Sequence, residues 1–106
     1  MTKIEFSSEA INDLQEIKEY ISEDLSNEKA AINTITKIMK NIRVLADYPE
    51  SVPSLSSIID FPTKYRFLVC GNYNAFYRVE DNTVYIIRVL YCRRNFMQIL
   101  FGSVQD

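Results

Sequence analysis

The last third of the chain, Lys64–Phe101, reads KYRFLVC-GN-YNAFYRVE-DN-TVYIIRVLY-CRRNFMQILF. Three runs in it are rich in β-branched and aromatic residues, and we place strands at Lys64–Cys70, Tyr73–Glu80 and Thr83–Tyr91. The two-residue links between them, Gly-Asn and Asp-Asn, are typical of tight hairpin turns. This stretch therefore predicts a three-stranded antiparallel meander, against which the rest of the chain must pack.

A short helix is expected after the last predicted strand. Asn95 can cap its first turn, and Phe96–Phe101 places Phe96, Ile99 and Leu100 on one side. Gly102 marks its end.

Two amphipathic helices are predicted before the meander. Apolar side chains recur at helical spacing from Glu9 to Asp24, after Ser7 and Ser8 as candidate caps. The same period resumes after Ser26-Asn27 and runs to Ala46, before Pro49. Because the link between the helices is short, an antiparallel helix hairpin is the natural arrangement, and its apolar side must cover the sheet.

The remaining segments complete one α+β domain, residues 1–106. Lys3–Phe6 alternates polar and apolar residues, so we expect a short strand that joins the sheet as an edge. Tyr48–Pro62 contains all three prolines and is predicted to be a connecting loop. The expected architecture is an N-terminal strand, an antiparallel helix hairpin on a three- to four-stranded antiparallel sheet, and a short C-terminal helix.

The composition excludes several classes of chemistry. The chain has 106 residues, no histidine and two cysteines, so neither a metal cluster nor a Ser–His or Cys–His nucleophile can be assembled, and we expect no metal and no cofactor. Cys70 and Cys92 are interpreted as reduced core residues rather than a disulfide. No apolar run is long enough for a membrane span, and no apolar signal region opens the chain, so we expect a cytoplasmic protein without membrane contact.

Charge is divided unevenly along the chain. The net charge is −2, with an excess of carboxylates before residue 60 and an excess of basic residues after it. This division predicts either a face that attracts anions or two halves that neutralise each other, and both alternatives stay open. The basic side chains of the meander and tail are Lys64, Arg66, Arg78, Arg88, Arg93 and Arg94.

Strand register constrains which of these arginines can act together. With Asp81-Asn82 as the turn, Arg78 opposes Tyr85 and Ala75 opposes Arg88. On this register Arg78 and Arg88 point to opposite faces of the sheet. We therefore do not expect Arg78 and Arg88 to serve one site together. Arg88 is interpreted separately as structural, with a helix carboxylate as its partner.

The order of these elements resembles the RelE/ParE superfamily of bacterial type II toxin–antitoxin toxins. The resemblance covers essentially the whole chain and is carried by SSEAINDLQEIKEYI, YNAFYRVEDNTVYIIRVL and YCRRNFMQIL. It implies a growth-inhibiting toxin of a plasmid-stabilisation type, bound by a cognate antitoxin and meeting operator DNA only through that antitoxin.

Two activities are implied by the branches of this superfamily. RelE-like members cut mRNA on the ribosome without a metal, and by resemblance Arg94 would be the catalytic arginine. The other RelE-like positions are altered: Asn74 replaces an arginine, and the tail tyrosine falls near Leu100 or Phe101. The hairpin and the YCRRN ending are more similar to the ParE branch, whose studied members poison DNA gyrase.

Three functions therefore remain open at this level. The first is a toxin that binds and inhibits a protein target of the gyrase type. The second is a ribosome-dependent endoribonuclease with an incomplete residue set, and the third is a non-toxic module that binds antitoxin. The candidate target- or phosphate-binding residues are Lys64, Arg66, Arg78, Arg93 and Arg94, although Arg93 and Arg94 could instead lock the tail through carbonyls or carboxylates.

Overall fold

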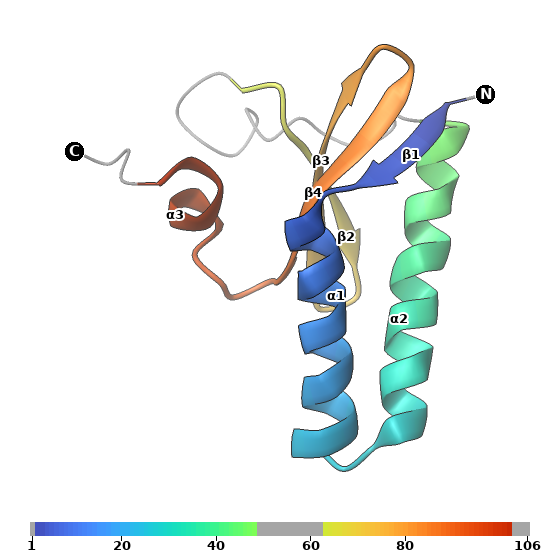
Figure 1. The fold of residues 1–106 in the computed structure, drawn as a ribbon, viewed down its shortest axis with the longest axis vertical. Helices are drawn as coiled ribbons and strands as arrows, with labels where there is room; N and C mark the ends of the chain where they lie inside the picture. Colours follow the sequence, from blue (N-terminus) through green and yellow to red (C-terminus); the bar gives the residue numbers. More distant parts are fainter. Residues whose placement is uncertain (1, 49–62, 103–106) are drawn as a thin grey trace.

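The computed structural model describes residues 2–48 and 63–102, in which four strands form one sheet. The strands are β1 (Lys3–Phe6), β2 (Arg66–Cys70), β3 (Tyr73–Glu80) and β4 (Thr83–Tyr91). Their order across the sheet is β1-β4-β3-β2 (Figure 1). Most of the predicted connecting loop Tyr48–Pro62 lies outside the described residues.

The meander has the predicted turns. Gly71 adopts a φ of 62°, and Asp81 and Asn82 adopt 49° and 60°. Two consecutive residues at positive φ match the right-handed twist of the flanking strands, which is why Asp-Asn suits this position. The bounds of β3 and β4 are those predicted, while β2 begins two residues later than Lys64.

The expectation of a wholly antiparallel sheet is corrected at its N-terminal edge. β1 pairs in parallel with β4, beginning with Lys3 opposite Thr83. The helix hairpin ends beside the start of β1, as the hydrogen bond from the Thr2 N–H to the Ala46 carbonyl at 3.4 Å shows. β3 is antiparallel to both of its neighbours, so β2 and β4 both run in the direction of β1.

The two long helices are capped as predicted. α1 (Ser8–Glu19) begins after Ser7, whose Oγ accepts the Ala10 N–H at 3.0 Å, and continues as a π-helical turn, η1 (Tyr20–Asp24). α2 (Glu28–Arg43) begins after Asn27, whose Oδ1 accepts the Ala30 N–H at 3.0 Å. A 3-10 turn, η2 (Val44–Ala46), ends this helix at the residue expected from the sequence.

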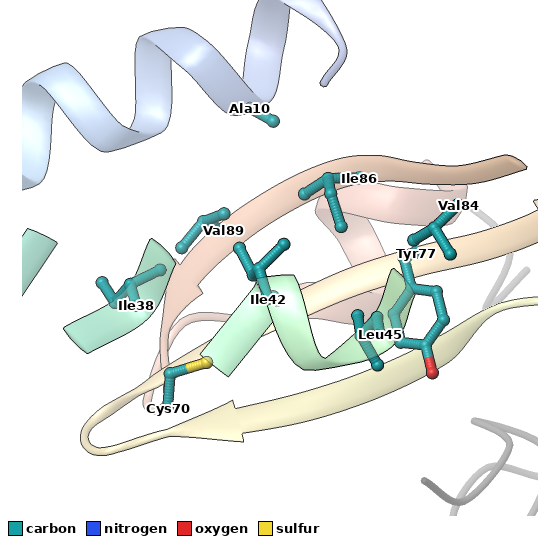
Figure 2. Close-up of a cluster of buried hydrophobic side chains, with 10 residues drawn as sticks. Ala10, Ile38, Ile42, Leu45, Cys70, Tyr77, Val84, Ile86 and Val89 are labelled. Atoms are coloured by element: carbon teal, nitrogen blue, oxygen red, sulfur yellow. The ribbon is translucent and has the colours of Figure 1, made fainter. Parts of the chain in front are cut away.

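The helix hairpin covers one face of the sheet and forms the main core. Ile38 and Ile42 of α2 pack with Tyr77, Ile86 and Val89 of the sheet, and all five side chains are buried (Figure 2). Within the described residues, no helix is long and apolar enough to span a membrane.

The short C-terminal helix contributes a second cluster. α3 (Phe96–Phe101) is capped by Asn95, whose Oδ1 accepts the Gln98 N–H at 3.3 Å. The Phe96 ring stacks on Phe76 with 5.3 Å between centroids, beside the buried Leu90. Because Phe76 and Tyr77 are neighbours on one strand, their clusters lie on opposite faces of the sheet. The sheet is thus covered by the hairpin on one face and by α3 on part of the other.

Candidate functional site

The candidate basic residues lie at two ends of the sheet rather than in one patch. Arg66 starts β2 opposite Tyr77, near the end of β3 that carries Arg78. Arg93 and Arg94 follow the opposite end of β4. Tyr91 lies six positions after Tyr85, the partner of Arg78, which corresponds to roughly 20 Å along the strand. Each end must therefore be assessed by itself.

Arg78 already has partners inside the protein. Its Nε lies 3.4 Å from a carboxylate oxygen of Glu80, and its guanidinium lies 4.9 Å from the centroid of the Tyr85 ring. Arg66 has an interaction partner as well, whereas Lys64 is exposed. The end of the sheet at Arg78 is therefore partly neutralised.

Arg88 is structural, as predicted, and its carboxylate partner is Asp13 of α1. Arg88 Nε and Nη2 donate to the two oxygens of Asp13 at 2.7 and 2.8 Å. These hydrogen bonds raise the pKa of Arg88 above its usual range, although burial acts in the other direction. The predicted register is wrong here, because a bulge at Ile87 places Arg88 opposite Phe76 instead of Ala75. The prediction that Arg78 and Arg88 point to opposite faces of the sheet is therefore wrong, because Arg88 now lies opposite Phe76, which shares its face with Arg78. The two arginines nevertheless have different partners and do not share a site.

Asp13 also closes an open stretch of sheet edge. β1 stops opposite Ile86, so among residues 2–48 and 63–102 no strand pairs with the rest of β4, up to Tyr91, on that side. The Val89 N–H donates to Asp13 Oδ2 at 3.0 Å, and Ser7 Oγ donates to the Ile87 carbonyl at 2.7 Å. Side chains from the start of α1 thus replace the missing strand. The sequence signal was available, because Asp13 is the carboxylate on the apolar side of the first helix, but its role was not predicted.

A groove of about 790 Å³ opens beyond this contact, between α1 with η1 and the ends of β3 and β4. Its lining includes Glu16, Tyr20, Tyr73, Tyr91 and Arg94. The rings of Tyr73 and Tyr91 meet edge-on with 5.8 Å between centroids. Burial raises the pKa of Tyr73, and neighbouring groups, Tyr91 first, add to the effect. The groove is therefore an aromatic surface with charge at its margin.

Arg94 is the one member of the predicted set among the residues that line this groove. Its N–H donates to the Tyr91 carbonyl at 2.9 Å, which turns the chain after β4. Arg93 and Arg94 are both exposed, and neither has an ion-pair partner among residues 2–48 and 63–102. Of the strand tyrosines, Tyr77 is buried in the core, Tyr73 and Tyr85 are half-buried, and Tyr91 is 44% exposed.

The positions at which this chain differs from the RelE-like nuclease pattern lie on the other face of the sheet. Asn74 pairs with Val69 and Leu90 within the sheet. Leu100 and Phe101 pack against the cluster around Phe76. In the described residues these positions offer a neutral amide and two hydrocarbon side chains, none of which transfers a proton.

The two cysteines differ in exposure, and this corrects the expectation that both lie in the core. Both are free thiols; Cys70 is buried and Cys92 is exposed after β4. Burial raises the pKa of the Cys70 thiol, and a hydrogen bond with Asn41 lowers it only in part. Cys70 is therefore protected both by burial and by retention of its proton.

We predict that only one thiol equivalent reacts with an aromatic disulfide reagent in the native protein at pH 8. Denaturant should release the second, because it exposes Cys70 and removes the cause of its raised pKa. Absorbance of the released thiolate measures both phases. Cys92→Ser should remove the fast phase and Cys70→Ser should retain it, whereas two fast thiols in the wild type would contradict the buried position of Cys70.

Comparison with known proteins places the chain in a family. Residues 4–96 match the family model described as the ParE toxin of the type II toxin–antitoxin system parDE. No match was found among curated proteins. A solved structure described as the chromosomal ParDE TA system from P. aeruginosa is similar at 18% identity, with a TM-score of 0.72, covering 86% of this chain and 96% of the other.

A second solved structure, the E. coli DinJ-YafQ complex, is similar at 15% identity, with a TM-score of 0.55. The likeness covers 96% of this chain and all of the other. At such identities the structural comparisons show a shared fold. The family model matches most of the chain, and the protein therefore belongs to the ParE toxin family of type II toxin–antitoxin systems.

Proposed function

We propose that this toxin arrests growth by binding and inhibiting an essential cytoplasmic protein, with DNA gyrase as the family precedent, and that a cognate antitoxin neutralises it. The observation that carries the proposal is the apolar packing of Leu100 and Phe101 on the α3 face of the sheet. An RNA-cleaving site needs a proton-transfer group within hydrogen-bond reach of the reacting oxygen. Neither side chain supplies one.

The distribution of basic groups supports the same function. Cleavage at a phosphate requires several cationic groups converging on the developing charge. Here Arg78 is engaged by Glu80, Arg88 by Asp13, and Arg94 lies at the far end of the sheet from Arg66. The protein also has a net charge of −2, whereas tight binding to ribosomal RNA generally depends on many phosphate contacts.

One observation keeps the endoribonuclease as a second candidate. Arg94 is exposed and has no ion-pair partner within the described parts of the chain, so its charge is available to a phosphate or to a protein carboxylate. A single arginine can stabilise charge without a proton-transfer partner, but only with reduced catalysis.

The test is induction of the toxin without antitoxin, followed by growth, mRNA 5′ ends and plasmid supercoiling. We expect growth arrest with relaxed or broken plasmid and unchanged mRNA ends. Arg94→Ala should raise the inducer level needed for arrest by about 10-fold, corresponding to the loss of one charged contact. Arg43→Ala, at an exposed basic residue near the end of α2, is the matched control and should leave arrest unchanged.

Other outcomes identify the alternatives. Codon-phased mRNA cuts with intact supercoiling would establish the endoribonuclease instead. Clear expression without a growth defect would indicate a module that has lost toxicity and only binds antitoxin.

A further inference from the structure

We infer that the outer face of α2 binds the phosphate backbone of duplex DNA. This basic face consists of Lys29, Asn33, Lys37 and Lys40, which follow one another at intervals of four, four and three residues. Such intervals place side chains on one side of a helix. The inference goes beyond the proposed function, which concerns a protein target. It also differs from the expectation that DNA is met only through an antitoxin.

The basic face lies opposite the side of α2 that is buried on the sheet. Ile38 and Ile42 of the main core are two positions before and after Lys40, which places them on the far side of the helix. All four residues of the basic face are exposed. α2 lies beside α1 in the helix hairpin (Figure 1), and its outer face is therefore open to a partner within the described parts of the chain.

Charge in the helix hairpin is segregated by helix. From Lys29 to Ala46 the chain contains basic residues and no aspartate or glutamate. The lysines of the basic face form no ion pair with another residue among residues 2–48 and 63–102. The segregation therefore does not serve salt bridges between the helices, and the lysine charges are available to a partner. The exposed carboxylates gather on α1 and η1 instead, at Glu9, Glu16, Glu19, Glu23 and Asp24.

The arrangement of the lysines is unfavourable for α2 itself. Lys29 is the second residue of the helix, where the helix dipole disfavours a cation. Lys37 and Lys40 are neighbours three residues apart and carry the same charge. Of the three lysines, Lys40 alone occupies the last turn, where a cation is favoured. Helix stability does not account for this pattern, whereas bound phosphates would compensate all three charges.

The chemistry of the basic face fits a phosphate backbone better than a protein surface. Lysine ammonium and asparagine amide groups both donate hydrogen bonds to phosphate oxygens. The face contains no aromatic or large apolar side chain of the kind that forms the buried centre of a protein interface. It likewise offers no ring on which an unpaired base could stack, which favours a duplex over a single strand.

The length of the basic face matches several phosphates. Lys29 and Lys40 are eleven positions apart, which corresponds to about 16 Å along the helix axis. Charges on one strand of duplex DNA recur about every 3.4 Å along its axis, so each lysine can reach a different phosphate. So few contacts give weak binding that depends on salt and, because phosphates carry no sequence information directly, does not depend on sequence. The carboxylates of α1 repel the backbone and limit the side from which it approaches.

The experiment measures binding of the full chain to a labelled mixed-sequence DNA duplex by fluorescence anisotropy over a range of salt concentrations. The double variant Lys37→Gln/Lys40→Gln should weaken binding about 10- to 100-fold at low salt. It should also reduce the slope of log affinity against log salt by about two, one for each lost phosphate contact. Circular dichroism verifies that the variants are folded.

The matched control is Lys18→Gln. Lys18 is exposed in the last turn of α1, as Lys40 is in the last turn of α2, so both substitutions remove one charge from the same position relative to a helix dipole. Because Lys18 lies on the acidic helix, its loss should change duplex affinity by less than about twofold.

Two further probes distinguish other anionic partners. A mixed-sequence single-stranded RNA should bind more weakly than the duplex at the same salt concentration. Tighter binding of this RNA that requires Lys37 and Lys40 would overturn the assignment to duplex DNA. Vesicles of phosphatidylcholine and phosphatidylserine should also bind more weakly than the duplex, and lysine-dependent vesicle binding without duplex binding would assign the face to lipid headgroups instead.

Two results with the duplex itself would overturn the inference. One is an absence of wild-type binding at low salt. The other is a double variant that keeps the wild-type affinity and salt slope, because other groups would then contact the DNA. Neither measurement depends on growth arrest, so a failure of the proposed function would leave the result on the basic face unchanged.

Discussion

Replacing Asp13 with alanine is expected to lower the free energy of unfolding by about 3–5 kcal/mol. The residue is only 8% exposed, and its carboxylate accepts hydrogen bonds from Arg88 and from the Val89 N–H. Alanine leaves the Arg88 guanidinium and the Val89 N–H without their acceptor. Leaving such groups unpaired when they are out of contact with water destabilises the fold by more than the original hydrogen bonds stabilised it. Urea unfolding followed by circular dichroism would record the loss as a lower midpoint at unchanged slope.

The companion variants test the mechanism of this loss. Asp13→Leu combined with Arg88→Met removes both charges and should be less destabilising than Asp13→Ala alone, because only the Val89 N–H is then orphaned. Glu19→Ala, at an exposed carboxylate on the same helix, should stay within about 0.5 kcal/mol of wild type. A loss below about 1 kcal/mol for Asp13→Ala would show that water replaces the carboxylate and that the contact is not effectively buried.

The features predicted correctly are those that local chemistry decides. Asp81-Asn82 fixes a hairpin because two adjacent residues must accept positive φ, and Asn95 fixes the start of α3 because its side chain can accept the Gln98 N–H. Such turns and helix starts depend on a few neighbouring residues, so they can be predicted from the sequence.

The features missed or mispredicted depend on packing between distant segments. The parallel pairing of β1 joins strands from opposite ends of the sequence, and the bulge at Ile87 lies directly after Ile86, the last residue of β4 that pairs with β1. The bulge adds one residue to β4, so Arg88 does not pair with Ala75 as it would in a regular hairpin. Asp13 finds its partner across 75 positions of sequence, a distance over which no periodicity gives information.

The candidate site shows the same division. The sequence identified Arg94 as a functional candidate but grouped it with Arg66 and Arg78, which the strand directions place at the other end of the sheet. The groove beside Arg94 is lined by residues from η1 and from β4, and the expected α-helical period did not reveal the π-helical turn that carries Tyr20. The role of Arg94 in binding stays a prediction until the Arg94→Ala variant is measured.

Replacing Phe76 with alanine is expected to lower the free energy of unfolding by about 3–5 kcal/mol and to release α3 from the sheet. Phe76 is 1% exposed, and its ring stacks on Phe96 at 5.3 Å. α3 has six residues, too few to stay helical without tertiary contacts. The cavity left by Phe76 would therefore remove the main support of a helix that has little stability of its own. Hydrogen exchange of the amides at residues 96–101 measures this release separately from global unfolding.

Ile42→Ala provides the matched comparison on the opposite face. This substitution should lower the free energy of unfolding by about 2–5 kcal/mol, because the Ile42 side chain of α2 is 1% exposed in the main core. Under native conditions it should leave the amides of α3 protected from exchange. Val69→Ala, at a residue 59% exposed on β2, should alter neither quantity appreciably. If the amides of α3 exchanged equally fast in Phe76→Ala and Ile42→Ala, the tail would open only with the whole domain. α3 would then be part of the same cooperative unit as the helix hairpin, and the two faces of the sheet could not be loosened independently.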